Sequence, residues 1–132
     1  MVQVHPHQPF NNMKQELQDS LAKKFPTVFK NIDGDIRQTC MAWGITCGDG
    51  WYTIIHDLCI LLESRGAVAE QVKEKYGTLR FYVSNTDDEV DTAITEAEKL
   101  SEKTCELCGK PGTLTTKHGW LMTRCLACTD TE

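Results

Sequence analysis

The feature that most constrains how this chain can fold is a pair of cysteine pairs near its C-terminal end. The segments "CELCGKPG" and "CLAC" give the spacing C-x2-C, sixteen residues, C-x2-C. This spacing is typical of structural zinc sites, because zinc prefers four tetrahedral ligands and thiolates bind it well. We therefore expect one structural Zn²⁺ ion, held by Cys105, Cys108, Cys125 and Cys128.

The residues around these cysteines predict a zinc ribbon-like module over residues 105–132. Between the two pairs, "TLTTKHGWLMTR" predicts a short β-hairpin that turns near His118-Gly119 and returns the second pair to the first. The segment is too short to form a core, so metal binding should supply most of its folding free energy, on the order of 10 kcal/mol. Four thiolates leave no open coordination position, which predicts a structural rather than a catalytic ion.

Three alternatives to a site of four thiolates are weaker. Four free cysteines would rarely have this paired spacing. A redox-active disulfide at one C-x2-C would leave the other pair unexplained. A site in which His118 replaces one cysteine conflicts with the place of this histidine at the expected tip of the hairpin.

The composition is that of one folded domain. Of the 132 residues, 40% are hydrophobic and 25% are charged. No apolar run approaches the roughly 20 residues that span a bilayer, and the first residues lack the basic start and apolar block of a secretory signal. We expect a cytoplasmic protein whose seven cysteines are mostly reduced.

The formal net charge of −5 gives the chain no general attraction for nucleic acid. The excess lies in residues 51–104, which hold six basic and eleven acidic side chains. Nucleic-acid binding would therefore need a local basic patch.

Apolar periodicity predicts three helices in a domain over residues 10–104, preceded by a loose tail over 1–9. Apolar residues recur at steps of three and four over 10–25, 51–64 and 87–102. Asp49 is expected to cap the second helix, and Asn85 or Thr86 the third.

The stretch "CMAWGITC" predicts a strand over residues 40–47. Its alternation places four side chains on one buried face: Met41, Trp43, Ile45 and Cys47. Cys47 and Cys59 then read as small buried apolar residues. Cys40 falls on the other face, and its role stays open, as does that of His56, which faces away from it on the expected helix. A Cys–His nucleophile is accordingly disfavoured.

A β-hairpin is expected over residues 67–85, with a type II′ turn at Gly77-Thr78. That register places Lys75 opposite Arg80 and Lys73 opposite Tyr82. These four residues would form a basic-aromatic face, and two opposed cations indicate an anionic neighbour. The neighbour is either the acidic stripe of the helix over 87–102, or an acidic protein surface or a nucleic-acid backbone.

These elements predict an α+β fold, with three helices around a small, mainly antiparallel sheet and a C-terminal zinc ribbon-like module. The segments "CGDGW", "VKEKYGTLRFY" and "CELCGKPG" followed by "GW" resemble those of small uncharacterised proteins encoded by tailed phages and prophages. The resemblance spans roughly residues 45–128 and is distinctive in its motifs. It implies a virus-linked cytosolic context and supplies no catalytic residue.

Three functions are then expected in decreasing order. The first is a non-enzymatic zinc protein that binds a protein partner, for example a host protein. The second is a nucleic-acid-binding zinc protein that uses Lys73, Lys75, Arg80 and Tyr82, an expectation that rests partly on analogy with other zinc ribbons. The third is a small hydrolase that uses Cys40, His56 or Asp57, which nothing in the sequence brings together.

Overall fold

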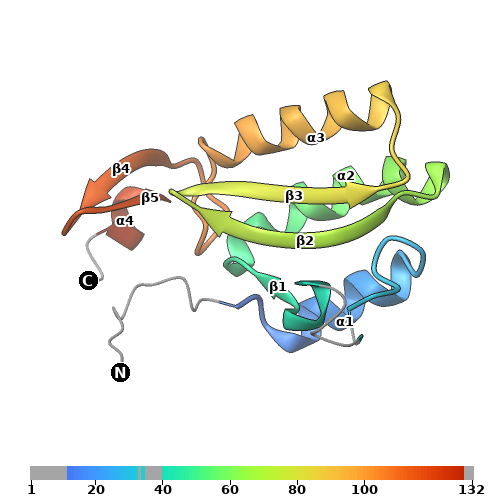
Figure 1. Ribbon diagram of the computed structural model, residues 1–132. Coiled ribbons are helices and arrows are strands. Elements are labelled where there is room, and N and C mark those ends of the chain that lie inside the picture. Colours follow the sequence, from blue (N-terminus) through green and yellow to red (C-terminus); the bar gives the residue numbers. More distant parts are fainter. Residues whose placement is uncertain (1–11, 33, 35–39, 130–132) are drawn as a thin grey trace.

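The computed structural model describes residues 12–32, 34 and 40–129 (Figure 1). The expected tail over residues 1–9 and the expected start of the first helix at Phe10 lie outside this part. Within it, the chain forms the following elements: α1 (Gln15–Lys24), η1 (Cys40–Trp43), β1 (Ile45–Thr46), η2 (Asp49–Trp51), α2 (Tyr52–Arg65), β2 (Val68–Lys75), β3 (Thr78–Ser84), α3 (Asp88–Ser101), β4 (Thr113–Lys117), β5 (Trp120–Arg124) and α4 (Leu126–Thr129).

The α+β class is confirmed, but the helix count is wrong. The described residues form four α-helices, because the second cysteine pair lies on the short helix α4, in addition to the two 3₁₀ helices η1 and η2. A three-stranded sheet has the order β1-β2-β3, with β1 parallel and β3 antiparallel to β2. The strands β4 and β5 form a separate antiparallel hairpin.

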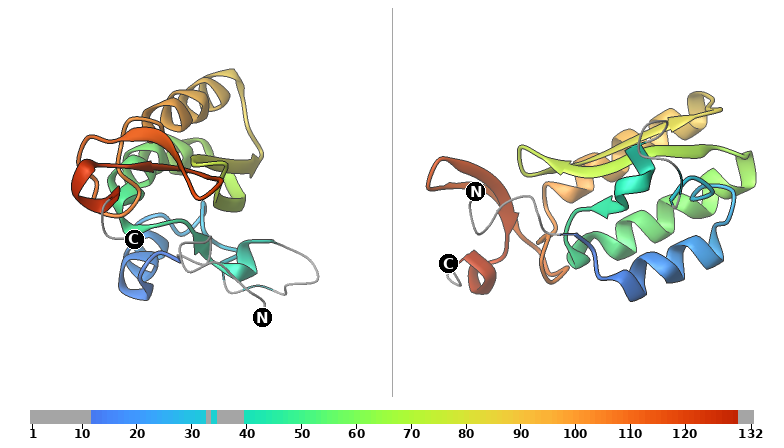
Figure 2. Two further views of the ribbon diagram at one scale, coloured as in Figure 1. Left: turned by 90° about the vertical axis from the view of Figure 1, so that its left-hand side faces the viewer. Right: turned by 60° about the horizontal axis from the view of Figure 1, so that its bottom comes forward.

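The helices α2 and α3 pack side by side against the sheet, and α1 packs beside α2 (Figures 1 and 2). Trp51, Ile55 and Leu62 of the second helical segment are fully buried in the same core as Val72 and Leu79 of the sheet. The β4–β5 hairpin and α4 lie at one end of the molecule, beyond the tip of the β2–β3 hairpin. None of the helices in the described part is long and apolar enough to cross a membrane.

The expected strand over residues 40–47 is largely wrong. Cys40–Trp43 form a 3₁₀ helix, and Gly44, at a φ of +81°, separates it from a strand of only two residues. Buried Gln18 organises this turn, because its Oε1 accepts a hydrogen bond from the Ile45 amide and its Nε2 donates to the Met13 carbonyl. Trp43 is consequently 63% exposed instead of buried.

Both expected helix caps are also wrong. The Asp49 carboxylate accepts a 2.8 Å hydrogen bond from the Lys14 amide at the start of α1, and α2 has no side-chain cap. At the start of α3, the cap is Asp87, which accepts a hydrogen bond of 2.9 Å from the Val90 amide. Asp49 thus joins two segments 35 residues apart instead of closing its own helix.

The β2–β3 hairpin forms, but its turn lies one residue earlier than expected. Tyr76 and Gly77 occupy the turn with positive φ values of 55° and 85°. Positive φ at both turn residues is the type I′ geometry, in which glycine is favoured in the second place. The register therefore pairs Lys73, not Lys75, with Arg80, and Gln71, not Lys73, with Tyr82.

Candidate metal centre and the surfaces around it

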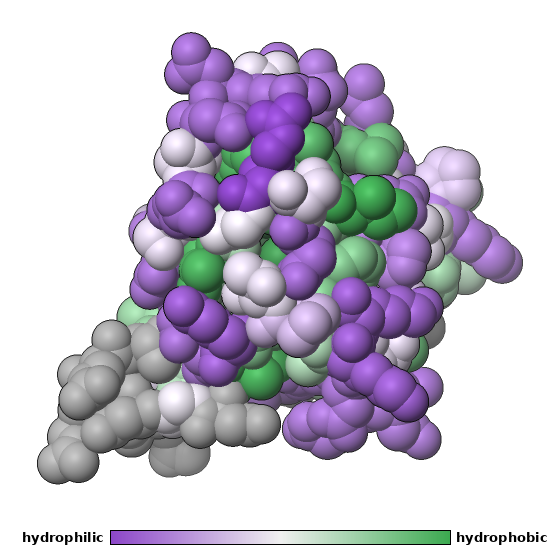
Figure 3. All heavy atoms as spheres, turned by 90° about the vertical axis from the view of Figure 1, so that its right-hand side faces the viewer, coloured by the Kyte–Doolittle hydropathy of each residue, from purple (hydrophilic) through white to green (hydrophobic). Residues whose placement is uncertain are grey.

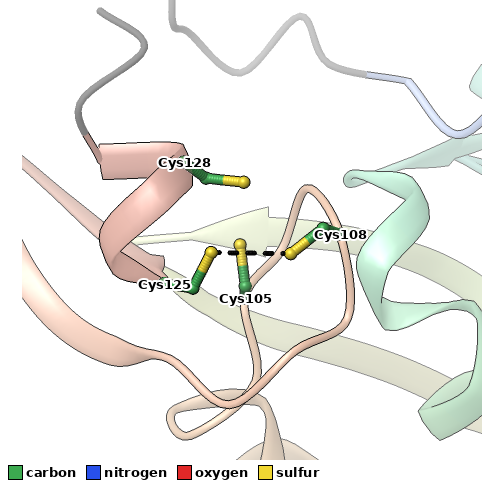
Figure 4. Close-up of side chains that lie close together, drawn as sticks. All are labelled: Cys105, Cys108, Cys125 and Cys128. Atoms are coloured by element: carbon green, nitrogen blue, oxygen red, sulfur yellow. Dashed lines mark hydrogen bonds between the residues drawn. The ribbon is translucent and has the colours of Figure 1, made fainter.

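Four cysteine side chains converge at the end of the molecule beyond the hairpin tip. The Sγ atoms of Cys105, Cys108, Cys125 and Cys128 all lie within 4.8 Å of one another, and they point toward a common centre (Figure 4). The Cys108 and Cys125 sulfurs are 3.6 Å apart. A metal–sulfur bond of about 2.3 Å in tetrahedral geometry separates the sulfurs by about 3.8 Å. The cluster can therefore hold one metal ion.

Backbone geometry on both sides shapes this cluster. The Gly109 amide donates to the Cys105 carbonyl over 2.9 Å, and Gly109 has a φ of +84°, so the chain reverses directly behind the first cysteine pair. On the other side, the Thr129 amide donates to the Cys125 carbonyl over 2.9 Å, which closes the turn of α4. Each C-x2-C segment thus folds as a tight knuckle.

Backbone amides also favour the thiolate forms of two of these cysteines. A hydrogen bond from the Cys128 amide lowers the pKa of the Cys125 thiol to about 7. Burial opposes ionisation of Cys105, but hydrogen bonds from the amides of Cys125, Cys108 and Leu107 bring its pKa below the ordinary value. Because a metal binds thiolates, this polarity suits the cluster to a cation.

The first knuckle is anchored in the loop that precedes α2. The Glu106 carboxylate accepts a 2.8 Å hydrogen bond from the Gly48 amide, and the Glu106 carbonyl accepts one of 2.7 Å from the Gly50 amide. A Cβ atom on Gly50 would lie 2.1 Å from the Cys105 carbonyl oxygen, and one on Gly48 would lie 2.4 Å from that of Glu106. Only glycines at 48 and 50 permit this approach.

The tip of the β2–β3 hairpin contacts the other side of the cysteine module. Thr123 Oγ1 donates to the Gly77 carbonyl over 2.7 Å. A Cβ atom on Gly77 would lie 2.6 Å from Cδ1 of Leu114 and 3.0 Å from the Met122 amide nitrogen. In addition, the Trp51 indole donates to the Thr104 carbonyl. Three segments that are distant in sequence therefore meet around residues 104–109.

Charged groups are buried at this junction. Burial, followed by the nearby charge of Glu74, raises the pKa of Glu106 to about 7. Burial likewise raises the pKa of Glu74, whose carboxylate accepts a hydrogen bond from the Gly77 amide. Arg124 is 5% exposed and lies near both carboxyl groups. Since these groups link the knuckle, the hairpin tip and β5, their contacts depend on the module staying docked.

The expected basic-aromatic residues share one face of the β2–β3 hairpin. Residues directly paired across antiparallel strands lie on the same face, and faces alternate along a strand. The observed register therefore places Lys73, Lys75, Arg80 and Tyr82 together, opposite the face that buries Val72 and Phe81. Tyr82 is 43% exposed. Within the described part of the chain, no ion pair involves any of these three cations.

The acidic helix α3 is occupied elsewhere. It runs along the free edge of β3, where Glu98 accepts a hydrogen bond from the Phe81 amide and Ser101 Oγ accepts one from the Leu79 amide. At its start, Asp87 and Glu89 form ion pairs with Arg65. The helix thus protects a sheet edge and contributes no ion pair to the basic face among the described residues.

The structure does not assemble a cysteine–histidine pair. His56 packs against the rings of Phe25 and Tyr52, and its Nδ1 lies 3.1 Å from the Asp57 carboxylate. Cys40 is exposed on η1, and it makes no hydrogen bond with His56 in the described structure. Burial raises the pKa of Cys47 and Cys59 above the ordinary thiol value, which makes both unreactive.

Sequence reasoning missed the part that Gly48, Gly50 and Glu106 play. The glycines read as a turn, and Glu106 reads as a spacer inside C-x2-C. A signal existed in the tight grouping of two glycines around an aspartate, which is unusual before a helix and suggests close backbone approach. Comparisons of the chain with protein-family models, curated proteins and solved structures found no match.

Proposed function

We propose that this protein is a non-enzymatic, zinc-containing protein-binding factor that acts in the cytoplasm on a protein partner. The observation that carries the proposal is the closed cluster of four sulfurs within 4.8 Å, docked beside the tip of a hairpin with a basic-aromatic face. Four thiolates favour zinc and leave no coordination position for a substrate. The ion would then be structural, and it would hold the module against the hairpin.

The partner would bind Lys73, Lys75, Arg80 and Tyr82. Partly exposed tyrosine and arginine are enriched in protein interfaces, and cations without internal ion pairs favour an acidic partner surface. The motif resemblance adds a context in which a phage-encoded factor engages a bacterial host protein, for example to inhibit a defence system or redirect transcription.

An affinity capture from bacterial lysate tests this proposal, with the zinc-loaded chain as bait. The test variant combines Lys73→Glu, Lys75→Glu and Arg80→Glu. The matched control combines Lys23→Glu, Lys24→Glu and Lys30→Glu, which make the same charge change at exposed positions on and after α1. We expect one stoichiometric partner that the control recovers and the test variant loses. Recovery of no such partner, or equal recovery by both variants, contradicts the proposal.

A second candidate is a nucleic-acid-binding zinc protein that uses the same face. The observation in its favour is that Tyr82 is exposed beside cations, an arrangement that allows a base to stack while the cations contact phosphates. Such binding should weaken steeply as salt rises. A gel-shift titration at low salt distinguishes the two, because the absence of any shift rejects this second candidate and leaves the first.

A further inference from the structure

A groove runs between α2 and α3, on a different part of the molecule from the basic-aromatic face and the cysteine cluster. It consists of two adjoining hollows of about 440 Å³ and 260 Å³, which share Leu61, Ala93 and Glu96 in their linings. Each flanking helix has 14 residues, which corresponds to a length of about 20 Å. The groove can therefore accommodate several turns of a third helix.

The floor of this groove is apolar. Ile54, Leu58 and Ala97 line the smaller hollow together with Leu100, which is 51% exposed. Figure 3 shows exposed apolar groups among charged ones on the end of the molecule where α2 ends and α3 begins. An apolar strip between two helices is the surface into which an amphipathic helix packs its own apolar side chains.

The rim of the groove is acidic. The charged residues that line the two hollows are Asp57, Asp88, Glu89 and Glu96, and no lysine or arginine lines them among the described residues. Glu89 is paired with Arg65, and Asp57 with His56. Asp88 and Glu96 form no ion pair with another described residue. The uncompensated charge lies beside the apolar floor.

We propose that the α2–α3 groove binds an amphipathic helix of a partner protein whose polar face is rich in lysine or arginine. An apolar stripe of that helix would cover Leu61, Ala93 and Leu100, and its cations would lie beside Asp88 and Glu96. Charge complementarity selects this occupant over an acidic helix. The chain's own helix α1 does not fit the description, because its apolar side is buried in the core through Leu21.

This inference extends the proposed function, since it assigns a helical partner chemistry to a protein-binding factor, but it uses different residues. The probe is a synthetic peptide of about 15 residues with leucine at positions i, i+3, i+4 and i+7 and lysine elsewhere. A scrambled peptide of equal composition keeps the charge and removes the apolar stripe. Binding to the full-length, zinc-loaded chain is measured by fluorescence anisotropy.

Two variants of the protein locate the binding. The test variant combines Asp88→Lys and Glu96→Lys, and Leu100→Asn is a separate test of the apolar floor. The control combines Glu16→Lys and Asp19→Lys, which make the same charge change on exposed positions of α1. All the substituted side chains are exposed, so each variant should keep the wild-type circular dichroism spectrum.

We expect the amphipathic peptide to bind at least about tenfold more tightly than its scrambled form, and each test variant to lose about tenfold in affinity while the control keeps most of it. Equal binding of the scrambled peptide, or equal loss in the control, would show general charge attraction and overturn the proposal. A dimer of the chain that Glu96→Lys dissociates would also overturn it, because the occupant would then be a second copy. Lysate capture through Lys73, Lys75 and Arg80 is scored separately, so failure of the two proposals can be told apart.

Discussion

Gly50 and Glu106 are joined by a 2.7 Å backbone hydrogen bond, although 55 residues of chain lie between them. The bond places the first cysteine knuckle directly on the loop that opens α2. The absence of a Cβ atom at Gly50 allows the contact, because such an atom would lie 2.1 Å from the Cys105 carbonyl oxygen. The geometry of the candidate metal centre is therefore set partly by a loop outside it.

Gly50→Ala should separate the cysteine knuckle from this loop. The new methyl group would meet backbone atoms, which cannot rotate away as a side chain does, so we expect a loss of about 1–3 kcal/mol or more in unfolding free energy. Chemical denaturation of the zinc-loaded chain measures it. Gly119→Asn is the control, since nothing lies within 4 Å of the added atom and asparagine tolerates a positive φ. A Gly50→Ala variant as stable as this control would show that the loop can move.

Glu106→Ala should destabilise the protein more than Glu106→Gln does. Alanine leaves the buried Gly48 amide without an acceptor, which costs about 1–3 kcal/mol. Glutamine keeps a side-chain oxygen within reach and removes a buried carboxyl group, so its cost should be smaller. Thermal unfolding of both variants at neutral pH checks the order. Equal losses would mean that the hydrogen bond to Gly48 contributes little.

Metal removal should unfold the cysteine module before the α+β part. We expect about one zinc ion per chain in purified protein, lost in Cys125→Ser but kept in Cys40→Ser, because Cys40 is outside the cluster. Metal content follows from inductively coupled plasma mass spectrometry. Hydrogen exchange over residues 104–129 should rise on chelation, with a smaller rise in α2. Unchanged exchange after complete metal loss would contradict a folding role for the ion.

Alkylation should distinguish three classes of cysteine. In the zinc-loaded chain, iodoacetamide should label exposed Cys40 alone, since burial raises the pKa of Cys47 and Cys59 and encloses both thiols. Chelation should then expose the four cluster cysteines while Cys47 and Cys59 stay unlabelled. Peptide mass spectrometry reads the sites. Early labelling of Cys59 would show that the core opens more easily than its packing implies.

The Asp87 cap should make stability depend on pH in acid. A hydrogen bond from the Val90 amide, and then the bond and charge of Arg65, lower the pKa of Asp87 below its ordinary 3.8. The unfolded chain then binds the proton more readily, so the stabilisation is present above pH 3.8 and is lost as pH falls through the lower folded value. Asp87→Asn, which keeps a capping side chain, should lower the melting temperature by a few degrees at pH 7. The difference between wild type and variant should shrink below pH 3, and a constant difference would contradict the assignment.

The sequence alone determined the features that depend on local pattern. Spacing of the cysteines placed the cluster, and apolar periodicity placed α2 and α3 within one or two residues of their observed ends. Alternation along residues 67–85 also placed Lys73 and Arg80 on one hairpin face, although it misplaced the turn. These features follow from the chain's own periods of two and 3.6 residues and from ligand chemistry, which neighbouring residues specify.

Only the tertiary structure decided how these parts join. The hairpin turns at Tyr76-Gly77 where Gly77 packs on Leu114 and Met122, Asp49 caps α1 instead of α2, and Glu106 fills a socket that Gly48 and Gly50 leave open. Each contact links segments tens of residues apart, and its energy depends on surfaces that exist only after both segments have folded. A local pattern cannot encode such a partner, because the same glycine or aspartate satisfies a nearby turn equally well until the distant backbone arrives.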